Sequence, residues 1–101
     1  MSNTKTPLTP KERQALKQQA HHLNPTVMVG QSGLTDAIIQ EADSSLTAHE
    51  LIKIRVLGDD REEREAIYQT LCEKLDAHPV QHIGKLLVIW RPNEVKPEKK
   101  K

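Results

Sequence analysis

The stretch VMVGQSGLTDAI, residues 27–38, places two glycines around two polar residues, between an apolar run and the start of a helix. Gly30 and Gly33 carry no Cβ, so a loop built on them lets a ligand approach the backbone closely. The first turn of the following helix presents free N–H groups and the positive end of its dipole, which favours a phosphate. The loop is therefore predicted to bind phosphate, and a tight turn without a ligand is the alternative. The candidate contacts within the loop are Gly30, Gln31, Ser32 and Gly33.

The loop matches neither of the two common nucleotide-binding patterns. It lacks the third glycine and the downstream ribose-binding acid of a dinucleotide fold, and it lacks the lysine of a P-loop. The remaining functional interpretation is a loop that clamps the sugar-phosphate backbone of a nucleic acid, as the GxxG loop of KH domains does. A four-residue GxxG pattern is weak evidence for a binding loop because glycine pairs are common in turns, so the rest of the sequence must decide between the two interpretations.

Charge is segregated along the chain although the net charge is only +1. Residues 1–33 contain four basic residues and one acid, whereas residues 34–50 contain acids and no Lys or Arg. Residues 58–79 contain seven acids and three bases. If the acidic segments form helices on one side of a sheet, the other side is left basic and attracts a polyanion.

Three helices are predicted from their caps and apolar stripes. The first, about residues 10–22, begins with the capping box TPKE at residues 9–12 and stops at Asn24-Pro25. The second is capped by Thr35, and its stripe is Ile38, Ala42 and Leu46. The third begins at Asp60 and Glu63, has Ile67, Leu71 and Leu75 as its stripe, and ends at His78-Pro79.

Four strands are predicted between and after these helices. TVMV at residues 26–29 is short and apolar, which is typical of a buried strand. ELIKIRVL at residues 50–57 alternates, with Ile52, Ile54 and Val56 on one face and Lys53 and Arg55 on the other. VQHI runs through Gly84-Lys85 into LLVIWR, which indicates a hairpin.

The predicted order is helix-strand-helix-strand-helix-strand-strand, an α/β fold with a four-stranded mixed sheet. At 101 residues the chain is expected to form one domain over 8–92, with an N-terminal tail at 1–7 and a basic disordered tail at 93–101. The chain has no apolar span or signal-peptide pattern, and Cys72 is its single cysteine. These features predict a soluble, cytoplasmic protein with no membrane contact.

No catalytic or metal-binding pattern is present, so an enzyme is not expected and no cofactor is predicted. Cys72 is expected to be a buried thiol. His21 and His22 are adjacent and point apart on a helix, and the other histidines lack a partner at ligand spacing. Trp90 is one of two aromatic residues, so a row of stacked bases is excluded and a packing role is predicted.

Three blocks resemble the CRM domain, also called the CRS1-YhbY domain: VGQSGLT at 29–35, HELIKIRV at 49–56 and IGKLLVIWRP at 83–92. The similarity runs from about Leu8 to Pro92, and the single copy is similar to single-domain bacterial members. The resemblance implies an RNA-binding module that associates with precursors of the large ribosomal subunit and assists ribosome assembly. It also implies a fold similar to the C-terminal domain of translation initiation factor three. Carried onto this sequence, the family's GxxG loop falls on Gly30–Gly33 with Leu34 and Thr35 beginning the helix, so the resemblance implies RNA contacts from all six residues. Gln31 and Ser32 are neutral, whereas many plant members have a basic residue between the glycines.

Because the loop itself is neutral, neighbouring basic residues must supply charge for contact with structured RNA, expected to be large-subunit ribosomal RNA. The candidates are Lys53 and Arg55 on the sheet, Lys85 and Arg91 on the hairpin, and Lys11 and Lys17 on the first helix. Solvated side chains on the wet side of a half-buried sheet are the alternative for the strand residues. A monomer is expected. Two other functions stay open: a protein-interaction adaptor on ribosomal proteins, and a binder of small anionic ligands.

Overall fold

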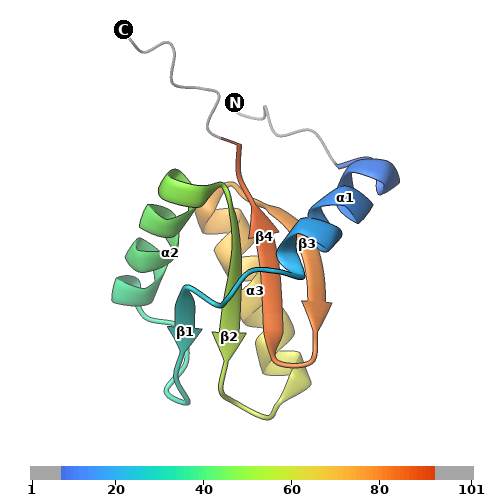
Figure 1. The fold of residues 1–101 in the computed structure, drawn as a ribbon. Helices are drawn as coiled ribbons and strands as arrows, with labels where there is room; N and C mark the ends of the chain where they lie inside the picture. Colours follow the sequence, from blue (N-terminus) through green and yellow to red (C-terminus); the bar gives the residue numbers. More distant parts are fainter. Residues whose placement is uncertain (1–7, 93–101) are drawn as a thin grey trace, which may run out of the picture.

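The computed structural model describes residues 8–92, and both predicted tails lie outside this range. The predicted order of elements is confirmed: α1 (Pro10–Ala20), β1 (Val27–Val29), α2 (Asp36–His49), β2 (Leu51–Val56), α3 (Arg61–Leu75), β3 (His78–Ile83) and β4 (Leu86–Trp90). The strands form one four-stranded sheet in the order β1-β2-β4-β3 (Figure 1). The sheet is mixed because β1 pairs parallel to β2 while the other two pairings are antiparallel.

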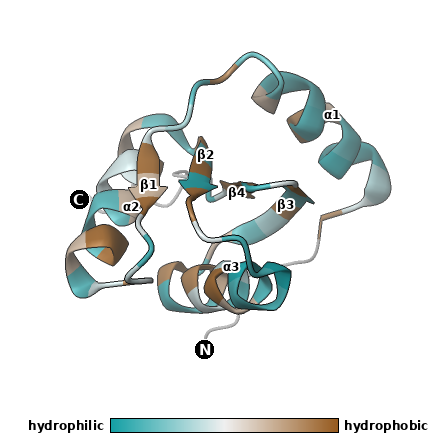
Figure 2. Ribbon diagram, turned by 90° about the horizontal axis from the view of Figure 1, so that it is seen from below, coloured by the Kyte–Doolittle hydropathy of each residue, from teal (hydrophilic) through white to brown (hydrophobic). Residues whose placement is uncertain are grey.

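The helices cover the two faces of the sheet unequally. Helices α2 and α3 lie on one face and α1 lies on the other, as seen end-on in Figure 2. The larger apolar cluster fills the space under α2 and α3 and includes Ile52, Ile54 and Val56, so the predicted alternation of this strand is correct. The smaller cluster, which includes Leu16 and Leu51, lies under α1. A single short helix leaves part of its face of the sheet uncovered.

The predicted helix starts are found in the structure. The Thr9 side chain accepts a hydrogen bond from the Glu12 N–H at 3.1 Å, and Glu12 Oε1 accepts one from the Thr9 N–H at 3.0 Å, which completes the capping box. Thr35 Oγ1 caps α2 by accepting from the Ile38 N–H, and Asp60 caps α3. Local sequence therefore sets where each helix begins.

Two predicted ends are wrong. Helix α3 stops at Leu75, where Asp76 adopts a left-handed conformation with φ 55°, rather than at His78-Pro79. His78 and Pro79 instead begin β3, an edge strand in which the missing N–H of proline is tolerated. Helix α1 ends at Ala20, slightly before the predicted end at residue 22.

The first strand is buried on one face only. Val27 and Val29 lie in the core, whereas Met28 between them is 54% exposed. The prediction of a buried strand was therefore half correct, because β1 is an edge strand and α1 does not extend over it. Within residues 8–92, no helix is both long enough and apolar enough to cross a membrane.

Tyr68 on α3 stabilises the fold, and this contribution is lost as the pH becomes strongly alkaline. Its hydroxyl donates a hydrogen bond to the Val88 carbonyl at 3.0 Å, and burial raises the pKa of Tyr68 well above its ordinary 10.0. Below pH 10 this contribution is fully present, because the phenol is protonated in both the folded and the unfolded chain. Above that pH only the unfolded chain loses the proton. The free energy of unfolding should then fall by about 1.4 kcal/mol per pH unit from this group.

Ultraviolet absorbance of tyrosinate reads this group alone, because Tyr68 is the single tyrosine of the chain. The folded protein should titrate at higher pH than the same chain in urea, and Tyr68→Phe should remove both the signal and this part of the pH dependence. Equal titration midpoints in the two states would contradict the assignment.

Candidate nucleic-acid interface

The GxxG segment forms a closed turn after β1. The Gly33 N–H donates to the Gly30 carbonyl at 3.0 Å, and the side chains of Gln31 and Ser32 between them are exposed. Gly33 has φ +93°, a conformation that favours glycine. Gly30 is outside the left-handed region, and a Cβ built on it meets nothing within 4 Å. A tight turn therefore explains Gly33 but leaves Gly30 without a structural requirement.

Leu34 and Thr35 position this turn on the domain. Leu34 packs against the larger core cluster, and Thr35 is the N-cap as predicted from the residues. Helix α2 therefore begins at Asp36, not at Leu34 and Thr35 as the family resemblance implied. Asp36 and Glu63 both line a shallow hollow beside this helix end. These two carboxylates weaken the attraction of the helix N-terminus for an anion. The turn itself is then the better candidate contact for phosphate.

Three loops meet at the end of the sheet that carries the GxxG turn (Figure 1). The Leu57 N–H donates to the Val29 carbonyl at 2.9 Å, which joins the ends of β1 and β2. The Val56 N–H donates to the Lys85 carbonyl at 2.8 Å, which joins β2 to the β3–β4 turn. The GxxG turn, the loop before α3 and the hairpin turn thus form one continuous edge.

Strand register arranges the sheet face that carries α1 into rows. One row runs Met28, Arg55, Leu86, Ile83 across all four strands, next to the edge with the three loops. The next row runs Lys53, Val88, Gln81. Arg55 is exposed and Lys53 is half-buried. Lys53 pairs with Val88, which belongs to the smaller cluster under α1, so both predicted strand residues lie on the face that carries α1.

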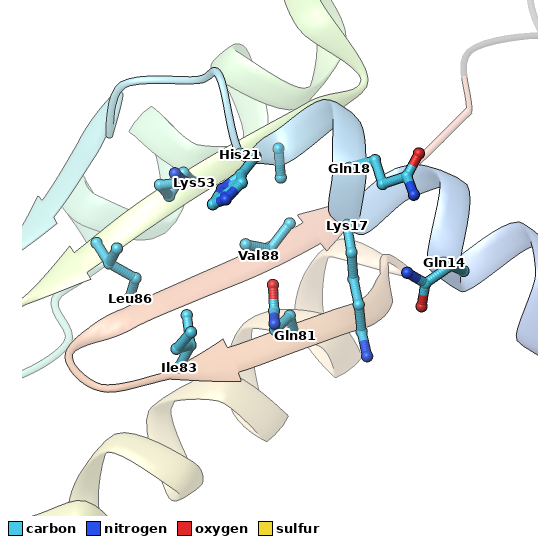
Figure 3. A pocket seen from close by; sticks show the side chains of 10 residues that line it. Gln14, Lys17, Gln18, His21, Lys53, Gln81, Ile83, Leu86 and Val88 are labelled. Atoms are coloured by element: carbon cyan, nitrogen blue, oxygen red, sulfur yellow. The ribbon is translucent and has the colours of Figure 1, made fainter.

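A groove of about 420 Å³ lies between α1 and this face (Figure 3). Lys17 extends into it from α1, and Lys53 lies at its other side. Its lining includes no aspartate or glutamate. Lys11, which is exposed in the first turn of α1, is not part of the lining. The predicted residues Lys17, Lys53 and Arg55 are thus brought onto one surface.

Lys85 lies in the hairpin turn at the edge of this surface, paired with Asp59 at 2.7 Å. The hydrogen bond from Lys85 is the main reason why the pKa of Asp59 is lowered. Both side chains are exposed, so the ion pair is weak and the Lys85 ammonium can exchange partners.

Arg91 was expected on the same basic sheet surface, and the structure places it elsewhere. Its guanidinium donates to the Asp43 carboxylate at 2.7 Å, to Thr47 Oγ1 at 3.0 Å and to the Leu75 carbonyl at 3.0 Å. These partners belong to α2 and to the end of α3, on the opposite side of the sheet from Lys53. Arg91 therefore ties the end of β4 to the two helices.

The predicted separation of charge is confirmed by the arrangement of the helices. Both acidic segments form α2 and α3, which share the face opposite α1. The acidic helices therefore lie on the opposite side of the sheet from Lys17, Lys53 and Arg55. A polyanion would be attracted to one side of the domain and repelled from the other.

Several groove residues were missed by the sequence analysis: Gln14, Gln18, His21, Gln81, Ile83 and Leu86. Gln14, Gln18 and His21 follow the spacing of one helix face, so a neutral polar stripe was visible. Because the strand register shifts between Pro79 and Gln81, the sequence did not indicate which side chains of β3 would face that stripe.

Other reactive side chains of the described residues form no site. Cys72 is buried in the core as predicted. Across residues 8–92, no group of three or more His, Cys, Asp or Glu residues is placed to hold a metal ion. Trp90 is partly buried against the smaller cluster, as its predicted packing role requires.

Comparisons with known proteins agree on one family. The family model for the CRS1 / YhbY (CRM) domain matches residues 8–91. An RNA-binding protein of Haemophilus influenzae is 46% identical over 89 residues, which cover 88% of this chain and 90% of that protein. The probable RNA-binding protein YqeI of Bacillus subtilis is 33% identical over 87 residues, covering 86% and 91% of the two chains.

A solved structure has the same fold. The solution structure of the hypothetical protein SAV1595 from Staphylococcus aureus matches with a TM-score of 0.77 and 32% sequence identity, covering 85% of this chain and 90% of that one. The family expected from three short sequence blocks is therefore confirmed along nearly the whole domain. The chain belongs to the CRS1/YhbY (CRM) domain family.

Proposed function

We propose that this protein binds structured RNA through the GxxG turn and the adjoining basic sheet face. The observation that carries this proposal is the placement of Lys17, Lys53 and Arg55 on the side of the sheet that carries α1, while the acidic helices α2 and α3 occupy the other side. RNA presents a dense row of phosphates, so a surface that is basic on one side only both attracts and orients it.

The names of relatives support the same class of ligand. The proteins from Haemophilus influenzae and Bacillus subtilis are called RNA-binding or probable RNA-binding proteins, and each matches most of this chain. The proposed contacts are mainly to phosphate and sugar, which carry little sequence information. Selectivity should therefore follow the shape of the RNA more than its sequence.

We further propose the biological setting that the family resemblance implies. The RNA is ribosomal RNA in precursors of the large subunit, and the protein assists assembly of that particle in the cytoplasm. It acts as a monomer that contributes binding and no chemistry of its own. A protein-interaction adaptor would instead bind such particles after nuclease treatment and at high salt.

A salt titration of RNA binding tests this proposal. The affinity of the wild-type protein for structured large-subunit ribosomal RNA should fall linearly on a plot of log affinity against log salt. The double variant Lys53→Ala/Arg55→Ala should bind up to about tenfold more weakly at low salt, with a slope shallower by about two. The reason is that each removed cation no longer displaces counterions from phosphate.

A matched control also removes one arginine and one lysine, but from the side of the domain that carries the acidic helices. Arg61 and Lys74 are exposed on α3, and the variant Arg61→Ala/Lys74→Ala should keep the wild-type slope. Equal weakening by both double variants would mean that net charge alone governs binding. Absence of RNA binding by the wild type at low salt would overturn the proposal.

A further inference from the structure

The groove between α1 and the sheet has features that phosphate binding does not require. Its floor includes Leu86 and Val88, and the side chain of Ile83 stands at its edge. Ile83 is 54% exposed, which is unusual for a large aliphatic side chain in a domain of this size. A phosphate gains nothing from an apolar floor, so the groove suits a ligand with a flat, weakly polar face.

Neutral hydrogen-bonding groups surround this apolar floor. Gln14 and Gln18 line the groove from α1, and Gln81 rises from β3 in the row of Val88 and Lys53 (Figure 3). Each amide offers both donors and acceptors. The edge of a nucleobase also carries donors and acceptors, so amides beside an apolar floor complement a base better than an ion.

We propose that this groove holds one unpaired nucleobase of the bound RNA. The inference rests on the proposed function and adds to it the kind of RNA that is preferred. Lys17 and Lys53 stand at opposite sides of the groove, where they can meet the phosphates on either side of the inserted nucleotide.

The size of the groove fits a single nucleobase, and an unpaired base is better suited to it than a paired one. Lys53, Val88 and Gln81 lie on three neighbouring strands, so their backbones span about 10 Å. The groove volume of about 420 Å³ is in the range of small-molecule sites. A base within a duplex has its Watson–Crick edge occupied and its faces stacked, whereas a bulged or looped-out base presents both to the groove.

Two hairpin RNAs that differ by one bulged nucleotide provide the test. The wild-type protein should bind the bulged hairpin about tenfold more tightly than the fully paired one. The variant Gln18→Ala/Ile83→Ala should lose most of this preference while keeping its affinity for the paired hairpin. Both replaced side chains are exposed, so the fold should be retained.

Met28→Ala is the matched control. Met28 is also 54% exposed and lies in the same row as Ile83, yet it is not part of the groove lining. This variant should keep the preference for the bulge. In a second measurement, 2-aminopurine at the bulged position should change its fluorescence on binding to the wild type but not to the groove variant.

The outcomes separate this inference from the proposed function. Equal affinity of the wild type for both hairpins, or a preference that the groove variant retains, would overturn the base-binding groove while RNA binding stands. Failure to bind either hairpin at low salt would overturn both proposals.

Discussion

Replacing Gly30 by aspartate is expected to lower the affinity for RNA by about thirtyfold, because a carboxylate next to a bound phosphate costs about 2 kcal/mol or more. The fold should be unaffected: Gly30 is outside the left-handed region and a Cβ there meets nothing within 4 Å. The measurement is equilibrium binding to structured ribosomal RNA, with the free energy of unfolding determined for the same preparation.

Gly30→Ala separates charge from bulk in this experiment. It adds the same Cβ without the carboxylate, so its affinity should lie much closer to the wild type. Gly33 is a poorer target because its φ of +93° would strain any replacement. A folded Gly30→Asp protein with wild-type affinity would show that RNA does not contact the turn.

The sequence correctly predicted those elements whose formation depends on residues close together in the chain. The capping box of Thr9 and Glu12 and the cap at Thr35 are set by residues within one turn, and alternation along 50–57 is a property of one strand. The order of elements and the sidedness of charge follow from these features. The end of α3 was predicted at His78-Pro79 because proline disrupts a helix, whereas the left-handed conformation of Asp76 ends the helix earlier.

The candidate site was predictable only in part because it depends on which helix faces pack against which face of the sheet. Lys17 and Lys53 are distant in the chain, and the packing of α1 on the smaller cluster is what places both beside one groove. Arg91 and Arg55 have the same side chain and both lie in or next to strands. What distinguishes them is the neighbouring helix, which no local pattern reveals.

Arg91→Met is expected to lower the free energy of unfolding by about 2 kcal/mol, while the folded variant keeps wild-type affinity for RNA. The side chain is only 20% exposed and joins Asp43 and Thr47 on α2 to the Leu75 carbonyl at the end of α3. Its removal leaves the Leu75 carbonyl and the Asp43 carboxylate without this donor. Denaturant unfolding, followed by binding at a temperature where the variant is folded, provides both readouts.

Lys85→Met is the matched control, because Lys85 also forms an ion pair at 2.7 Å but with both side chains exposed. Its removal should cost at most about 1 kcal/mol. The two ion pairs have the same N–O distance but are expected to contribute differently to the free energy of unfolding. Arg91 is more buried than Lys85 and also donates to backbone carbonyls. If Arg91→Met instead weakened RNA binding without loss of stability, the arginine would belong to the interface, and the acidic side of the domain would be in contact with RNA.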